Sequence, residues 1–205
     1  MWSNNKPWGY GILKSNAGDV YEGLFKNGYK HGTGVESYKN GGSYIGNFRD
    51  GKPEGHGKLT GYDGSVFTGN FVKGCKHGQG SWNIPTTEEC KIRGRTITLL
   101  GETEEPRQAL YSGPVEQGKI TGKAEVCWST GIEYKGDFVD NKRNGRGRML
   151  QRDGTVYEGP WVNGVAQGYG TLIQIDGYKH YGLFKDNMMI EKLDLDQFLK
   201  GRNQP

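Results

Sequence analysis

Large apolar residues and glycines alternate with polar residues in short segments along this 205-residue chain. Between Tyr21 and Phe25, the residues Tyr21, Gly23 and Phe25 are spaced by two. On an extended strand this spacing places all three on one face, while Glu22 and Leu24 point to the other. The pattern therefore predicts β-strands with one face made of rings and glycines.

The aromatic-x-Gly-x-apolar pattern returns with a period of 23 residues. Its copies begin at Tyr21, Tyr44, Phe67, Tyr111, Tyr134 and Tyr157, and a degraded copy begins at His180. A Gly-x-Gly pattern of the same period begins at Gly9, Gly32, Gly55, Gly78, Gly145 and Gly168, with Gly122 and Ala124 as a weaker copy. Glycine weakens a strand unless large rings lie over its bare backbone, so we expect rings of neighbouring strands to cover these glycines.

Turn signals separate the aromatic strand from the glycine strand in several repeats. They are Asn27-Gly28, Asp50-Gly51, Lys73-Gly74 and Asn163-Gly164, and Asn-Gly or Asp-Gly is typical of a two-residue hairpin turn. A single β-hairpin is marginally stable, so the hairpins must stabilise one another by stacking. The predicted fold class is all-β: an elongated, single-layer, twisted antiparallel sheet of about eight stacked hairpins.

One stretch, residues 83–110, lacks the aromatic-glycine signature. Phe67 and Tyr111 are 44 residues apart, which is two periods less two residues. We therefore expect one eroded unit there, with Cys90 near the aromatic position and a short strand from Ile92 to Leu100.

The chain is predicted to divide into a ribbon over residues 1–187 and a cap or tail over residues 188–205. Apolar residues at Met189, Ile190, Leu193 and Phe198 predict a short helix that covers the last hairpin. A helix that binds a partner is the alternative interpretation of this segment.

The segment from Tyr21 to Gly34 reads YEGLFKNGYKHGTG. It resembles the unit of the MORN (membrane occupation and recognition nexus) repeat family: Tyr-x-Gly-x-aromatic, then Asn/Asp-Gly, then Lys/Arg-His-Gly-x-Gly. The resemblance covers residues 6 to about 187, apart from the eroded unit. It implies a stand-alone member without a catalytic domain, a class commonly found as scaffold or adaptor parts of cytoskeletal, ciliary and membrane-junction structures.

Composition narrows the class further. The chain has 36 glycines and a net charge of only +4, which argues against an ordinary helical enzyme and against a nucleic-acid partner. No apolar run exceeds three residues, whereas a transmembrane helix needs about 20. The three cysteines, Cys75, Cys90 and Cys127, include no CxxC pair, which favours an intracellular, cytoplasmic protein and leaves a leaderless export route open.

Candidate chemistry fails on geometry, so we expect no enzyme, no cofactor and no metal. Residues 113–119 match seven positions of a phosphate-binding P-loop, but Ile120 replaces the Ser/Thr that binds magnesium, and the repeat itself generates the glycine spacing. His31 and His77 share one repeat position two units apart, about 20 Å in a stacked sheet, which is too far to share a metal ion.

Two surfaces remain as candidates for binding. The first is a partner-binding groove along the aromatic face, formed by Tyr21, Phe25, Tyr44, Phe48, Phe67, Phe71, Tyr134, Phe138, Tyr157 and Trp161. An exposed apolar stripe of this kind suits an extended peptide or helix. The competing interpretation is that these rings are simply the core.

The second surface is basic and consists of Lys142, Arg143, Arg146, Arg148 and Arg152. Such a cluster can bind anionic phospholipid headgroups, and the competing interpretation is that exposed strands carry cations for solubility and edge protection.

The expected function is therefore a non-enzymatic scaffold or adaptor for a protein partner within a cytoskeletal, ciliary or membrane-junction assembly. One alternative is a peripheral membrane tether. Another is a targeting subunit for a separate kinase or methyltransferase. Pairing of two copies as a homodimer through unsealed terminal strands is also open.

Overall fold

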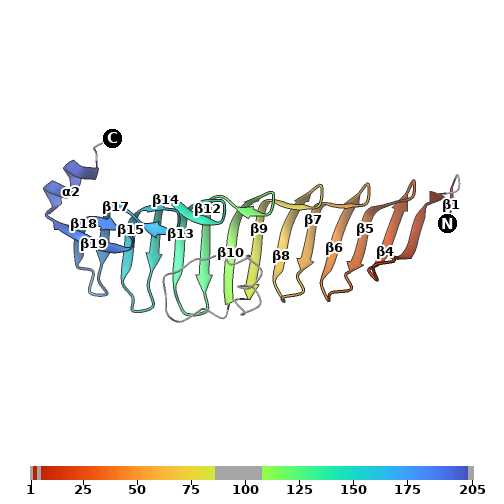
Figure 1. The fold of residues 1–205 in the computed structure, drawn as a ribbon, viewed down its shortest axis with the longest axis horizontal. Coiled ribbons are helices and arrows are strands. Elements are labelled where there is room, and N and C mark those ends of the chain that lie inside the picture. The colour runs from red at the N-terminus through yellow and green to blue at the C-terminus, as the bar shows by residue number, and fades with distance from the viewer. Residues whose placement is uncertain (1, 4–5, 86–107, 203–205) are drawn as a thin grey trace.

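The structure is a computed structural model and describes residues 2–3, 6–85 and 108–202. These residues form one long row of antiparallel strands, with the two ends of the chain at opposite ends of the row (Figure 1). The main strands are β3 (Gly9–Lys14), β4 (Val20–Lys26), β5 (Tyr29–Ser37), β6 (Ser43–Arg49), β7 (Lys52–Thr60), β8 (Val66–Val72), β9 (Cys75–Pro85), β10 (Gln108–Glu116), β12 (Gly122–Trp128), β13 (Glu133–Val139), β14 (Lys142–Leu150), β15 (Val156–Val162), β17 (Gly168–Ile173), β18 (Lys179–Lys185) and β19 (Met188–Leu193).

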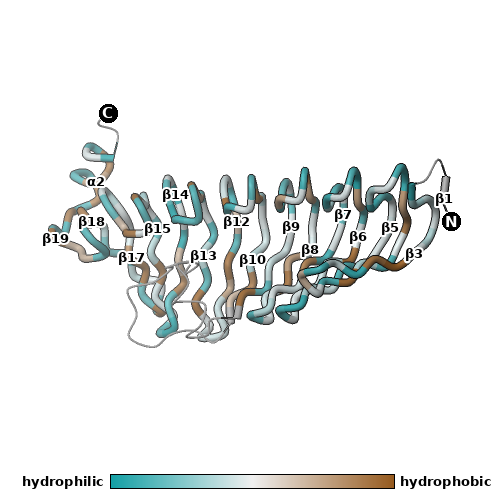
Figure 2. Tube along the Cα trace, turned by 45° about the vertical axis from the view of Figure 1, so that its right-hand side comes forward, coloured by the Kyte–Doolittle hydropathy of each residue, from teal (hydrophilic) through white to brown (hydrophobic). Residues whose placement is uncertain are grey.

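Short strands complete the row. β11 (Lys119–Ile120) pairs with β10, and β16 (Val165–Ala166) pairs with β15. At the N-terminal end, β1 (Trp2–Ser3) pairs with β2 (Lys6–Pro7). The predicted all-β, single-layer sheet of stacked hairpins is confirmed, and Figure 2 shows hydrophobic positions recurring at equivalent points of successive hairpins.

Within each hairpin, a two-residue turn with both φ angles positive joins the strands. Asn27 and Gly28 have φ of 53° and 90°, and Asp50 and Gly51 have 49° and 84°. These values match the type I′ turn, whose twist suits a hairpin. The four predicted turns are confirmed, and three that the sequence did not single out have the same geometry: Gln117-Gly118, Asp140-Asn141 and Asp186-Asn187.

A row of glycines crosses the sheet at right angles to the strands. Gly34 pairs with Gly23 and with Gly46, and Gly46 pairs with Gly57. A Cβ atom on Gly57 would lie 2.6 Å from two carbons of the Tyr44 ring. Large rings therefore lie on the bare backbone, as the sequence predicted, and glycine is needed at Gly57 because nothing larger fits under the ring.

The rings pack on one another in two series, from Tyr21 to Trp82 and from Tyr111 to Phe184, and the buried Val115 takes the aromatic position between them. Tyr44 contacts Phe48 and Phe71 with centroid distances of 5.0 and 4.9 Å and interplanar angles of 89° and 79°. This edge-to-face geometry is favoured by the ring quadrupoles. The centroids of Tyr111 and Phe138 are farther apart, at 6.5 Å. Between them Ala124 replaces a glycine of the row, and its methyl group takes up space that a glycine would leave free.

Tyrosine hydroxyls stabilise the irregular point of those hairpins whose first ring is a tyrosine. Tyr21 donates to the carbonyl of Leu24 at 2.8 Å, and Tyr44 donates to the carbonyl of Asn47 at 3.0 Å. Both carbonyls lie where a register shift interrupts the strand pairing. The hydroxyl thus satisfies a backbone acceptor that the bulge leaves without its ladder partner.

The predicted eroded unit has no place in the described sheet. β9 pairs directly with β10, and Gly80 lies opposite Gly113. The described residues therefore form seven complete hairpins, which begin with β4, β6, β8, β10, β13, β15 and β18. The expected strand from Ile92 to Leu100 and the position of Cys90 lie outside the described residues.

The last hairpin ends later than predicted. Residues Met188–Leu193 form β19, which pairs with β18 and belongs to the sheet, so the boundary after residue 187 is wrong. The predicted helix starts later than expected: α2 (Leu195–Arg202) contains Phe198, whereas Met189, Ile190 and Leu193 lie on β19. The helix begins at a capping box in which Asp194 and Gln197 each accept from the other's backbone N–H. Phe198 is buried against Tyr181, so α2 covers one face of the last strands.

Candidate functional site

The ten rings predicted to line a partner-binding groove are buried. Their exposed fractions range from 0% for Tyr44 and Phe67 to 8% for Phe25. The rings are covered by one another and by long cationic side chains at one repeat position, with Lys76 over Trp82 and Arg143 over Trp161. The ring face is therefore the hydrophobic core of the ribbon, and the assignment of these rings to a binding groove is corrected: they are buried core residues.

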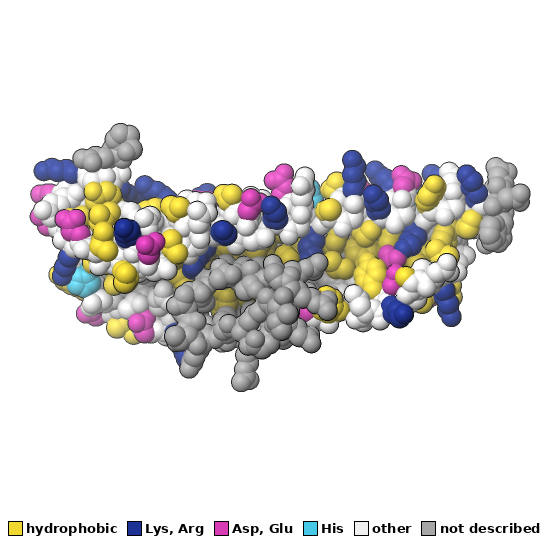
Figure 3. Space-filling model, in the orientation of Figure 1, with side chains coloured by type: hydrophobic (Ala, Val, Ile, Leu, Met, Phe, Trp, Pro, Cys, Tyr) yellow, Lys and Arg dark blue, Asp and Glu magenta, His cyan; other side chains and the backbone are white. Residues whose placement is uncertain are grey.

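The opposite face of the sheet carries the exposed side chains. At its N-terminal end, an apolar strip consists of Tyr10, Ile12, Leu24, Val35 and Ile45, whose exposed fractions range from 39% to 64%. Cross-strand pairing joins Tyr10 with Leu24 and Val35 with Ile45. We call this set the N-terminal strip. Figure 3 views the ribbon from the ring side, so it shows the cations along the upper margin of the sheet and not the N-terminal strip.

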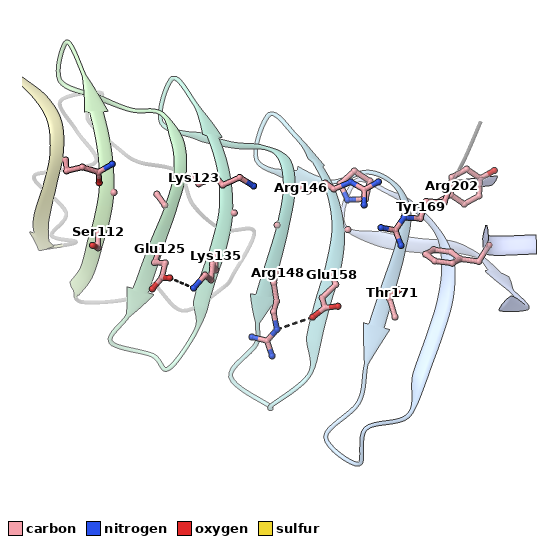
Figure 4. A pocket seen from close by; sticks show the side chains of 18 residues that line it. Ser112, Lys123, Glu125, Lys135, Arg146, Arg148, Glu158, Tyr169, Thr171 and Arg202 are labelled. Carbon is pink, nitrogen blue, oxygen red and sulfur yellow. Dashed lines mark hydrogen bonds and ion pairs between the residues drawn. The ribbon is translucent and has the colours of Figure 1, made fainter. Parts of the chain in front are cut away.

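Towards the C-terminal end, the same face holds a shallow charged groove of about 670 Å³. It extends over β9, β10, β12, β13, β14, β15 and β17 as far as α2 (Figure 4). Its lining includes Gln79, Ser112, Lys123, Glu125, Lys135, Arg146, Arg148, Glu158, Tyr169, Thr171 and Arg202. We call this depression the charged groove.

Most charges of the charged groove are paired across strands. Lys135 pairs with Glu125, and Arg148 Nε lies 3.2 Å from Glu158 Oε1. Lys123 Nζ lies 3.6 Å from Asp137 Oδ1 at the margin. These pairs are exposed, so each contributes little to stability and can exchange its partner for a ligand group.

Two further cations lie at the α2 end of the groove. Arg146 comes from β14 and Arg202 from the last turn of α2, and Figure 4 shows both near Tyr169. Among the described residues, neither guanidinium has a hydrogen bond or ion pair to another side chain. This corner is therefore the part of the groove with unbalanced positive charge.

The predicted lipid-binding cluster is not a single patch, because β14 separates its members. Arg143 is 3% exposed and lies on the ring face, where its guanidinium stacks 4.1 Å from the Trp161 centroid and its Nη2 donates to the Gly164 carbonyl. Arg146 and Arg148 lie on the opposite face. Lys142 begins β14 and Arg152 lies in the turn after its end, so the length of β14, about 26 Å at about 3.3 Å per residue, lies between them. The five cations cannot contact one headgroup together.

Other candidate residues occupy structural positions. Residues 113–119 run from β10 through the Gln117-Gly118 turn into β11, so they form a hairpin rather than a phosphate loop before a helix. His31 on β5 and His77 on β9 are separated by β6, β7 and β8. Within the described ranges, no three His, Cys, Asp or Glu side chains gather as a metal ion would require.

In the described part of the chain, no helix is long and apolar enough to span a membrane. Burial raises the pKa of Tyr21 and of Tyr44 to about 12. These hydroxyls donate hydrogen bonds inside the ladder, so their shifted pKa values reflect packing in the core.

Sequence reasoning missed the charged groove, although the repeat carried a signal for it. Where neighbouring hairpins pair in known register, Glu125 lies opposite Lys135, and Arg148 lies opposite Glu158. Charges at these positions therefore share a face away from the rings. The contribution of Arg202 could not be found in this way, because it depends on how α2 folds back over the sheet.

Comparison with known proteins agrees with this architecture. The model of the MORN repeat matches residues 1–20, 21–43, 44–66, 134–156 and 157–177. No curated protein sequence matches the chain.

Among solved structures, one match is described as the SAS-4 (dCPAP) TCP domain in complex with a Proline Rich Motif of Ana2 (dSTIL) of Drosophila melanogaster. It is 8% identical with a TM-score of 0.41, covers 85% of this chain and 77% of that chain, and shares too little for fold or function to be transferred. The glycine row, the ring ladder and the repeat model together identify this chain as a member of the MORN repeat family.

Proposed function

We propose that this protein is a non-enzymatic repeat scaffold that binds a protein partner on the sheet face opposite the rings. The main observation behind the proposal is that one face of the sheet is buried and the other is exposed. One face is a continuous buried ladder, and the other exposes the N-terminal strip, with Ile12 at 64% and Ile45 at 51%. Within the strip, Glu22 lies opposite both Ile12 and Val35, and exposed apolar side chains with polar neighbours mark partner sites.

The ring ladder suits this role because it fixes the spacing of the hairpins. Tyr134 contacts Phe138 in its own hairpin and Trp161 in the next at 5.1 and 5.4 Å. Each hairpin is therefore held by its neighbours, as in other stacked repeat proteins. The exposed face then offers a partner a fixed row of side chains.

The finer part of the proposal concerns the setting. The MORN family supports a repeat scaffold, and we propose that this one acts in the cytoplasm, within a cytoskeletal, ciliary or membrane-junction assembly. A separate kinase or methyltransferase would be one class of such partner. The membrane tether is the weaker alternative, because the five candidate cations lie on two faces and at both ends of β14.

Affinity purification with the full chain as bait tests the proposal. Wild type, the double variant I12S/I45S and the control variant I175S are compared by quantitative mass spectrometry of proteins retained from native extract. Ile175 is 82% exposed and lies in the loop before β18, away from the N-terminal strip. We expect specific proteins that wild type and I175S retain and I12S/I45S loses. Retention of the same proteins by all three would contradict the proposed face.

A further inference from the structure

We propose that the charged groove binds an extended acidic segment of a protein partner, with one carboxylate or phosphate group held between Arg146 and Arg202. This inference rests on the proposed scaffold function and names the chemistry of the segment that the C-terminal half of the same face would accept. It uses residues distinct from those of the N-terminal strip.

The charged groove has an excess of positive charge. Five cations and two acidic residues line it, an excess of three positive charges. Lys123 offsets one of these by pairing with Asp137, and Lys135 and Arg148 pair with the two acids. The remaining excess of two belongs to Arg146 and Arg202, so the complementary occupant is anionic.

Arg146 and Arg202 reach the same corner of the groove from two different elements. Arg146 projects from β14 within the sheet, whereas Arg202 comes from α2, which Phe198 anchors on Tyr181. A Cβ atom on Gly201 would collide with the Tyr169 ring, so the last turn of α2 lies directly on β17. Both guanidinium groups therefore approach one site from fixed elements (Figure 4). Arginine is suited to bidentate hydrogen bonds with carboxylate or phosphate oxygens.

The length of the groove indicates an extended peptide. Seven strands from β9 to β17 line it, and six intervals of about 4.8 Å give about 29 Å. At about 3.3 Å per residue, this length accommodates roughly nine residues of extended chain. A peptide running across the strands can meet the anion site at one end and the polar side chains of Ser112 and Gln79 at the other.

The arrangement disfavours a membrane surface as occupant. Glu125 and Glu158 lie in the same cross-strand row as Lys135 and Arg148, so a broad anionic surface would meet two carboxylates as well. A peptide can instead place its own charges selectively, with an acid at the arginine corner and neutral residues beside the two carboxylates.

Fluorescence polarisation with the full chain tests this inference. Three fluorescein-labelled nine-residue peptides share a Gly-Ser background and carry three Asp residues, three phosphoserines or three Lys residues at the same positions. We expect binding of an acidic peptide and no binding of the lysine peptide. Preference for Asp or for phosphoserine identifies the anion, and either preference supports the inference.

Variants locate the site. Arg146→Gln and Arg202→Gln should each weaken acidic-peptide binding by about tenfold or more, because each removes a charge-assisted hydrogen bond. Arg49→Gln is the matched control, since Arg49 is exposed at the end of β6, outside the groove. The charge reversal R146E/R202E should abolish acidic-peptide binding and allow the lysine peptide to bind.

The inference is overturned if the lysine peptide binds wild type as tightly as the acidic peptides. It is also overturned if R146E/R202E binds acidic peptides as wild type does. Flotation with vesicles of phosphatidylserine and phosphatidylcholine, without binding of any peptide, would instead assign the groove to lipid. None of these results alters the purification result for I12S/I45S, so the scaffold function is judged separately.

Discussion

A single methyl group at Gly57 tests whether rings resting on bare backbone hold the ribbon together. Gly57 lies on β7, in the glycine row, with the Tyr44 ring directly over it. A Cβ atom there would lie 2.6 Å from Tyr44 Cε2 and Cζ, closer than real Cβ atoms approach a neighbour. Tyr44 is fully buried, so its ring has no free space to enter. Gly57→Ala must therefore displace the ring or the strand.

The expected cost follows from two contributions. Overpacking of a well-packed core costs about 1–3 kcal/mol. Displacement of the ring also breaks the hydrogen bond from the Tyr44 hydroxyl to the Asn47 carbonyl, which is 3.0 Å long, at about 1 kcal/mol. We expect Gly57→Ala to lower the free energy of unfolding by about 2–4 kcal/mol, which corresponds to a fall in Tm of about 5–15 °C for a chain of this size.

Gly11 provides a matched control within the same row. It lies on the terminal strand β3 with a negative φ, and a Cβ atom there would meet the Phe25 ring at 3.5 Å, an ordinary contact. Alanine in a strand is favoured over glycine by roughly 0.5–1 kcal/mol. Gly11→Ala should therefore leave Tm unchanged or raise it.

Thermal unfolding of both variants, followed by far-ultraviolet circular dichroism, decides the matter. We expect a large fall in Tm for Gly57→Ala and no fall for Gly11→Ala. If the two variants unfold at the same temperature as wild type, or with equal losses, the ring and glycine contact does not stabilise the fold.

Three further outcomes follow from the structure. Arg143→Met should lower the free energy of unfolding by less than about 1.5 kcal/mol, because Ile120 and Met189 occupy the same position in other hairpins. Arg143→Glu should lower it by about 3–5 kcal/mol, because it places an unpaired negative charge over the rings. Denaturant titration compares the two variants. The folded chain holds the pKa of Tyr21 and Tyr44 at about 12 against an ordinary value of 10.0. Unfolding therefore releases protons between pH 10 and 12, so the contribution of these two tyrosines to stability is constant below pH 10 and is lost across that window. A tyrosine absorbance titration that shows these residues ionising near pH 10 without unfolding would refute this. Phe198→Ala should detach α2 and leave the sheet intact, because Phe198 is the buried residue of the helix. Amide hydrogen exchange should become faster in α2 alone. Loss of protection in β13 or β14 would contradict this expectation.

The hairpin repeat could be predicted because its determinants are local. Asn27-Gly28 and Asn163-Gly164 specify their turns directly, whereas Asp140-Asn141 forms the same turn without glycine. There the side chain of Asn141 accepts from the backbone N–H of Ile120 in the preceding hairpin. That contact joins residues 21 positions apart, so only the stacked structure reveals it.

The sequence left open whether the rings form a groove or the core, and it did not give the order of strands near residue 83. A single-layer sheet suggests exposed rings, but edge-to-face packing and cations such as Lys76 over Trp82 cover them. The 44-residue interval between Phe67 and Tyr111 is close to two periods, yet Gly80 pairs directly with Gly113. Periodicity counts residues along the chain, whereas pairing depends on which strand edges meet.

Chemical labelling of tyrosines in the native chain is the most direct test of the claim that one face is core and the other is free for partners. Nitration followed by mass spectrometry compares Tyr21, Tyr44, Tyr111, Tyr134 and Tyr157, all 5% exposed or less, with Tyr10, Tyr29 and Tyr178, which are 63%, 58% and 60% exposed. The account predicts rapid modification of the second group and modification of the first only on unfolding. Equal rates for both groups in the folded protein would contradict it.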